Sequence, residues 1–132
     1  MGVPQFPPSL DDLSAIAERV MADLPAPFRK AIAAVPILVE EFPSADVQAD
    51  MELESEFDIL GLYHGVDLAS KSFADTAGDI DRIFLYRRPI LDYWCETGEA
   101  LDHLVAHVLI HEIGHHFGLS DDDMEAIEAG LR

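Results

Sequence analysis

Residues 111–121 read HEIGHHFGLSD, and the histidines of this stretch are the features of the sequence that best indicate its fold and function. His111 and His115 are four residues apart, which on an α-helix corresponds to a rotation of about 400°. Their side chains therefore lie on one face, with their roots about 6 Å apart. Two imidazoles in this arrangement can bind one ion through Zn–N bonds of about 2.0–2.1 Å. The spacing predicts that both histidines are zinc ligands.

Glu112 directly follows the first histidine and is rotated from it by about 100° on the helix. Its carboxylate should therefore lie beside a bound ion rather than on it. In that place it can accept a proton from a zinc-bound water, whose pKa the metal lowers towards neutrality. The pattern predicts Glu112 as the general base of a hydrolase.

A third ligand is expected after the helix. Gly118 can end the helix and turn the following chain back under the site, because glycine adopts the left-handed conformation readily. Asp121 would then supply an oxygen ligand and leave the fourth position open to water. If the turn at Gly118 has a different shape, another carboxylate can be the third ligand in place of Asp121. The candidates are Asp122, Asp123 and Glu125.

Other histidines lie close to the pair in the sequence. His103 and His107 continue the four-residue spacing backwards, but the row drifts by about 40° per step, so His103 cannot share the ion of His115. A second metal at His103 and His107 lacks an acidic partner at a suitable spacing. His107 is therefore expected to be a hydrogen-bonded core or boundary residue, and His116 to be exposed.

The pattern of apolar residues predicts an α+β domain that spans residues 1–132, with residues 1–8 as an irregular lead-in. The residues around the histidine pair belong to a long helix over about 98–117, which Leu104, Val108 and Ile113 would anchor in the core. The other expected elements are helices at 9–24, near 27–32 and after Ser120, strands at 37–39, 58–66 and 83–86, a loop or partly helical connection at 43–51, and a solvent loop at 71–79.

The composition restricts the partners and the compartment. The formal net charge of −18 repels phosphate backbones, which argues against nucleic-acid binding and favours solubility or cationic partners. No uncharged apolar run approaches the roughly 20 residues needed to span a bilayer, and residues 1–8 do not resemble a signal peptide. Cys95 is the only cysteine, as expected for a reducing compartment, and we expect it to be buried. The sequence thus predicts a cytoplasmic protein.

The stretch HEIGHHFGLSD resembles the zincin-like metallopeptidase family of small bacterial proteins, whose motif is a short metzincin motif with Asp in place of the third His. Residues 60–65 (LGLYHG) and 83–87 (IFLYR) are similar to strand segments of that family. The resemblance covers most of residues 30–125. It implies a minimal zincin fold, in which a small mixed sheet of about three strands packs on the active-site helix. It also implies that His111, His115 and Asp121 bind one zinc ion and that Glu112 is the base.

The metzincins have a methionine turn well downstream of their third ligand, whereas here Met124 lies only three positions after Asp121 and could be a partial substitute for it. Met124 is instead expected to lie in the core, since Ile127 and Leu131 continue its apolar stripe.

The function expected from these features is hydrolysis of peptide bonds in a peptide or protein substrate, which would lie along an exposed strand edge. Two alternatives remain: a zincin scaffold that binds zinc or a partner without cleaving it, and a zinc hydrolase of non-peptide amides or esters. A hydroxyl or imidazole near the metal would stabilise the oxyanion, and the candidates for this role are Tyr63, His64 and Tyr86.

Overall fold

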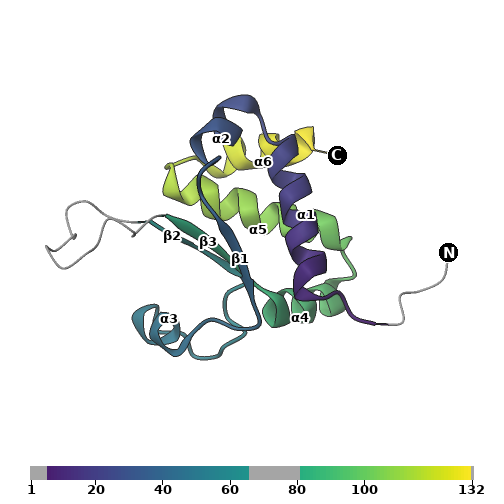
Figure 1. Cartoon of the computed structure of the whole chain (residues 1–132), viewed down its shortest axis with the longest axis vertical. Coiled ribbons are helices and arrows are strands. Elements are labelled where there is room, and N and C mark those ends of the chain that lie inside the picture. Colours follow the sequence, from purple (N-terminus) through teal and green to yellow (C-terminus); the bar gives the residue numbers. More distant parts are fainter. Residues whose placement is uncertain (1–5, 66–80, 132) are drawn as a thin grey trace, which may run out of the picture.

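The computed structural model describes residues 6–65 and 81–131. Within them, helices pack on a small sheet (Figure 1), which confirms the expected α+β class. The helices are α1 (Leu10–Asp23), α2 (Ala26–Ala31), α3 (Ala45–Asp50), α4 (Arg87–Thr97), α5 (Leu101–His116) and α6 (Asp121–Gly130), and the strands are β1 (Ile37–Glu40), β2 (Gly61–His64) and β3 (Arg82–Tyr86).

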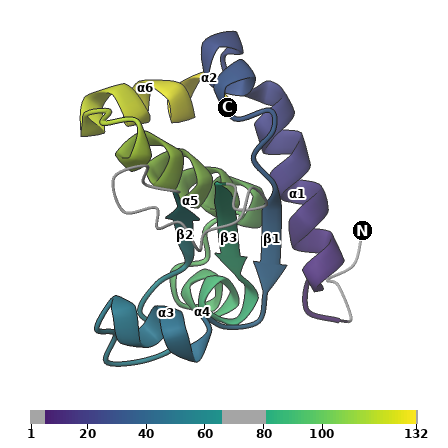
Figure 2. The same ribbon diagram turned by 60° about the vertical axis from the view of Figure 1, so that its left-hand side comes forward.

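The strands of the described residues form one mixed sheet in the order β1-β3-β2. β1 runs parallel to β3, with Ile37 opposite Ile83. β2 runs antiparallel to β3, with Leu62 opposite Phe84, and is an edge strand of this sheet. α1 and α5 pack together on the sheet, α1 against β1 and α5 against β2 and β3 (Figures 1 and 2).

α5 is the central helix of the hydrophobic core. Eight of its residues are buried, so it is enclosed on most of its circumference rather than along a single stripe. Leu104, Leu109 and Ile113 are at most 1% exposed and belong to one cluster with Leu13 of α1 and Leu85 of β3. Each such side chain contributes roughly 1.5–3 kcal/mol when buried. This packing fixes the orientation of α5, and with it the direction in which its histidines point.

Two expected elements differ in extent from the structure. Within the described residues, the strand expected at 58–66 covers Gly61–His64, and it begins late because the carboxylate of Asp58 accepts hydrogen bonds from the backbone N–H groups of Glu54 and Ser55 and closes a turn. The connection at 43–51 contains α3, which begins where Ser44 Oγ accepts a hydrogen bond from the Val47 N–H. The loop expected at 71–79 lies outside the described residues.

α4 was not predicted. A proline such as Pro89, shortly after the strand expected at 83–86, is typical of a strand end, but β3 continues directly into this helix, and Pro89 lies in its first turn. A proline is tolerated there because the N–H groups of the first turn have no partner within the helix. Cys95 lies on α4 and is exposed, so the expectation that it is buried was wrong.

A tight reversal joins α5 to α6. Gly118 has φ +72°, the left-handed conformation expected from the sequence, and the N–H of Leu119 donates to the carbonyl of Gly114. Ser120 then starts α6 as its N-cap. Met124 on α6 is fully buried, as expected for a core residue.

Gly114 allows α6 to approach α5 closely. A Cβ atom built at this position would overlap Met124, with Cγ only 2.7 Å away. Gly114→Ala is therefore expected to lower the free energy of unfolding by about 1–3 kcal/mol, the usual cost of overpacking a core. Chemical denaturation measures this change.

Gly130→Ala is a matched control for that substitution. Gly130 also lies in a helix, but a Cβ atom there meets nothing within 4 Å. Its replacement should stabilise the protein by about 0.5–1 kcal/mol, the helical preference of alanine over glycine. If both variants were equally stable, Gly114 would not be needed for the α5–α6 contact.

Candidate metal centre and active site

The histidine pair and the glutamate of the motif all lie on α5, as the sequence predicted. The rings of His111 and His115 are 6.0 Å apart between centroids and nearly perpendicular to each other. His115 lies near the carboxyl end of the helix and is exposed, whereas the side chain of His111 is only 26% exposed. The two rings therefore share a face of the helix, as two ligands of one ion require.

His111 has a ring nitrogen without a partner. Its Nε2 atom is buried and makes no hydrogen bond. Burial lowers the pKa of His111, and His107 lowers it further, whereas Glu128 and Asp121 raise it. The ring is therefore held towards its neutral form, in which a nitrogen lone pair can bind a metal. A buried nitrogen without a partner is the observation that best fits a zinc ligand.

Glu112 lies between α5 and the edge strand β2. Burial raises the pKa of its carboxyl above the usual value, while nearby His115 and a hydrogen bond from the backbone of Tyr63 lower it. Its charge also helps, after burial and Glu40, to raise the pKa of Tyr86 to about 12. The Glu112 carboxylate thus lies next to His111, partly withdrawn from water, and faces a strand edge. In this place it can accept a proton and return it.

Asp121, the expected third ligand, is the first residue of α6. It is close enough to His111 for its charge to raise the pKa of that histidine. Of the alternatives, Asp123 is already used, because its carboxylate accepts a hydrogen bond from the Ser120 N–H and forms a capping box. Asp121, Asp122 and Glu125 are all exposed, so exposure does not distinguish Asp121 from these two alternatives.

The structure brings together a group of ligands other than the expected one. Among the described residues, the group of three whose donor atoms all lie within 4.8 Å of one another is His107, His111 and Glu128. His115 and Asp121 do not complete such a group with His111. His107 Nδ1 lies 2.7 Å from Glu128 Oε1, and His111 Nε2 lies 3.7 Å from Glu128 Oε2.

An open groove of about 300 Å³ runs beside the candidate site. One wall is formed by α5 through His107, His111 and Glu112, and the other includes Leu60 and Gly61, at the start of β2. The groove thus joins the candidate metal ligands, the candidate base and an edge strand, which are the parts that hydrolysis of an extended peptide requires.

The model of the zincin-like metallopeptidase family matches residues 32–131. The chain belongs to this family. Among curated proteins, none matches the chain. The family match includes the sheet, α5 and α6, and confirms the resemblance carried by HEIGHHFGLSD. At the level of the family it indicates zinc binding and metallopeptidase chemistry. Within the part of the chain that the structure describes, no helix is long and apolar enough to cross a membrane.

Glu128, whose carboxylate lies with the rings of His107 and His111, was not predicted from the sequence as a candidate ligand. The absence of an acidic partner argued against a second metal at His103 and His107, but Glu128 provides such a partner for His107 and His111. A signal was present, since Glu128 lies four residues after Met124 and therefore on the same face of α6. His107 is hydrogen-bonded as expected, but its side chain is 53% exposed, so it lies at the surface rather than in the core.

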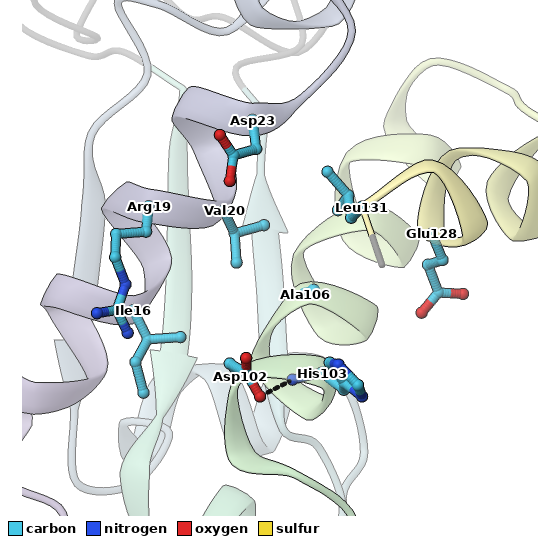
Figure 3. A pocket seen from close by; sticks show the side chains of 9 residues that line it. All are labelled: Ile16, Arg19, Val20, Asp23, Asp102, His103, Ala106, Glu128 and Leu131. Atoms are coloured by element: carbon cyan, nitrogen blue, oxygen red, sulfur yellow. Dashed lines mark hydrogen bonds between the residues drawn. The ribbon is translucent and has the colours of Figure 1, made fainter.

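His103 does not join these ligands. It lines a separate cavity of about 200 Å³ between α1, α5 and α6. Figure 3 shows Glu128 on the α6 side of that cavity and Arg19 on the opposite side. Glu128 thus lies at the border between the cavity and the histidines.

The three candidates for stabilising an oxyanion lie in different surroundings. The hydroxyl of Tyr63 donates a hydrogen bond to Asp81 at 3.0 Å, and burial together with this contact raises the pKa of Tyr63 to about 12. Its ring stacks on His116, which is an exposed residue, as expected. Tyr86 is 1% exposed, and His64 is an exposed residue at the end of β2. No single candidate is favoured by these contacts.

Proposed function

We propose that this zincin-like protein is a zinc-dependent peptidase in which His111, His115 and Asp121 bind the ion and Glu112 is the general base. The observation that carries the proposal is the position of Glu112, which lies beside His111 and accepts a hydrogen bond from the backbone of an edge strand. A zinc ion bound there would lower the pKa of its water and polarise the scissile carbonyl.

The edge of β2 supports binding of an extended peptide. The Tyr86 N–H donates to the Leu60 carbonyl, so these two residues form a hydrogen-bonded pair of the antiparallel ladder. Because such pairs alternate, the backbone groups of Gly61 and Tyr63 point away from β3. The Tyr63 N–H already donates to Glu112, so a substrate strand would pair with the outward groups of Gly61 and the Tyr63 carbonyl, and its own carbonyl would then lie next to Glu112.

In this arrangement Glu112 accepts the proton of the attacking water and then donates it to the leaving amine nitrogen. Partial burial keeps the carboxylate basic enough for the first transfer. The acidic chain, with its net charge of −18, favours peptides that carry positive charge.

The test combines metal analysis with cleavage of a peptide library. The purified protein should bind one zinc ion per chain and cleave peptides, and a chelator should abolish cleavage. His115→Ala should lose cleavage, whereas His64→Ala, on the exposed end of β2, should retain zinc binding. Stoichiometric zinc without turnover of any peptide would contradict the proposal and favour a binding module, and turnover of esters alone would favour another hydrolase.

The third ligand can be tested separately. Asp121→Asn is expected to weaken zinc binding at the His111–His115 site by about 100-fold or more, measured as the zinc concentration that restores peptide cleavage to the metal-free protein, because loss of even an indirect partner of a metal ligand costs about 10–100-fold. Asp122→Asn removes the same charge from the same helical turn and should change the affinity little. Equal affinities of the two variants would exclude Asp121 as a ligand.

A further inference from the structure

We propose that His107, His111 and Glu128 form a second site for a divalent metal of the zinc class, which shares His111 with the proposed peptidase site. The proposal rests on the three donor groups, which lie within 4.8 Å of one another, and on the buried Nε2 atom of His111. It does not depend on whether the protein cleaves peptides.

Glu128 has a hydrogen bond with His107 Nδ1 at 2.7 Å, which a bound ion would replace, but its distance to His111 fits a metal better than a hydrogen bond. The 3.7 Å between His111 Nε2 and Glu128 Oε2 is too long for a hydrogen bond. Two ligands of one tetrahedral zinc ion are about 3.3–3.6 Å apart, since each metal bond is about 2.0–2.2 Å long. An ion between them would give His111 Nε2 the partner that it lacks. Two imidazoles and one carboxylate are also a ligand set that zinc accepts.

The packing of two helices builds this site. His107 and His111 are four residues apart on α5, and their ring centroids are 4.0 Å apart. Met124 and Glu128 are four residues apart on α6. The contact of Met124 with Gly114 fixes α6 against α5, so that the next turn of α6 places Glu128 opposite the two histidines.

The charge at Glu128 favours a cation. Its side chain is only 12% exposed, and its ion pairs in the structure are with His107 and His111, which are charged only when protonated. Arg19 lines the neighbouring cavity but lies on its far side (Figure 3). A mostly buried carboxylate beside two imidazoles gains a partner of full positive charge when a metal ion binds.

Sharing His111 makes the two sites compete. His107 and His115 are eight residues apart, which separates them by about 12 Å along the helix. An ion bound between His107 and Glu128 therefore draws the Nε2 atom of His111 away from His115. A zinc ion at the second site would therefore keep the peptidase site empty, and its bound water would not lie beside Glu112. Because the two sites bind the same ion and share His111, the ratio of their affinities, and not the zinc concentration, sets the fraction of the protein held in this inactive form.

The experiment measures zinc binding in a variant whose proposed peptidase site is disabled. His115→Ala should still bind one zinc ion tightly, as shown by isothermal titration calorimetry and elemental analysis. Adding Glu128→Gln or His107→Ala to this variant should weaken binding by about 100-fold or more. Adding Glu125→Gln, the same change at an exposed position of α6, should leave the affinity within about threefold.

Thermal unfolding without metal checks that each variant is folded, and zinc should raise the melting temperature of His115→Ala but not of His115→Ala with Glu128→Gln. Unchanged zinc affinity on adding Glu128→Gln would overturn the proposal, as would loss of tight binding in folded His115→Ala itself. Two tight zinc ions in the wild-type protein would overturn the sharing of His111. None of these readouts uses peptide cleavage, so a protein without peptidase activity can still pass or fail the test.

Discussion

Replacing Glu112 with glutamine is expected to lower kcat for peptide cleavage by about 10²–10⁴-fold, the usual contribution of a positioned general base. The amide has nearly the same shape as the carboxylate, and its carbonyl oxygen can still accept the hydrogen bond from the Tyr63 backbone. It cannot take a proton from water. Substrate and zinc should therefore bind with similar affinity while turnover is lost.

Steady-state kinetics with a cleavable library peptide, together with zinc analysis of each preparation, measure this effect. Glu96→Gln is a suitable control, because Glu96 is an exposed glutamate on α4. It should reduce the net charge equally without changing kcat. Undiminished cleavage by Glu112→Gln would remove this residue from the mechanism.

The features that the sequence predicted are those fixed by local geometry. The helical spacing of His111 and His115 depends only on the helix repeat. The left-handed φ of Gly118 and the N-cap at Ser120 depend on residues within one turn. Met124 was predicted to be buried because its apolar stripe continues along α6. The family match extends this agreement to most of the chain.

The features that the sequence did not predict depend on how elements pack. Glu128 meets His107 only because Gly114 lets α6 approach α5 closely, and periodicity within one helix contains no information about that contact. The orientation of Glu112 towards β2 likewise depends on a strand more than 45 residues upstream. α4 was missed because Pro89 was interpreted without its position in the first turn of a helix.

The assignment of ligands makes His111 the most sensitive position of the molecule, because it is the residue common to both proposed metal sites. His111→Leu should abolish zinc binding at both, with a loss of affinity larger than either Glu128→Gln or Asp121→Asn causes alone. Cleavage should disappear with it. His103→Leu is a control of identical chemistry on the same helix, and the exposed His103 should change neither property.

The same substitution should have the opposite effect on the protein without metal. A buried polar atom that lacks a hydrogen bond costs about 1–3 kcal/mol, and leucine removes the Nε2 atom while filling a similar volume. We therefore expect metal-free His111→Leu to be more stable than the metal-free wild type by about 1 kcal/mol, since the side chain is partly exposed. Denaturation in the presence of a chelator measures this difference. If metal-free His111→Leu were less stable than the metal-free wild type, His111 would stabilise the fold by itself. Greater stability of the variant together with loss of zinc binding would show that the protein keeps this histidine for the metal.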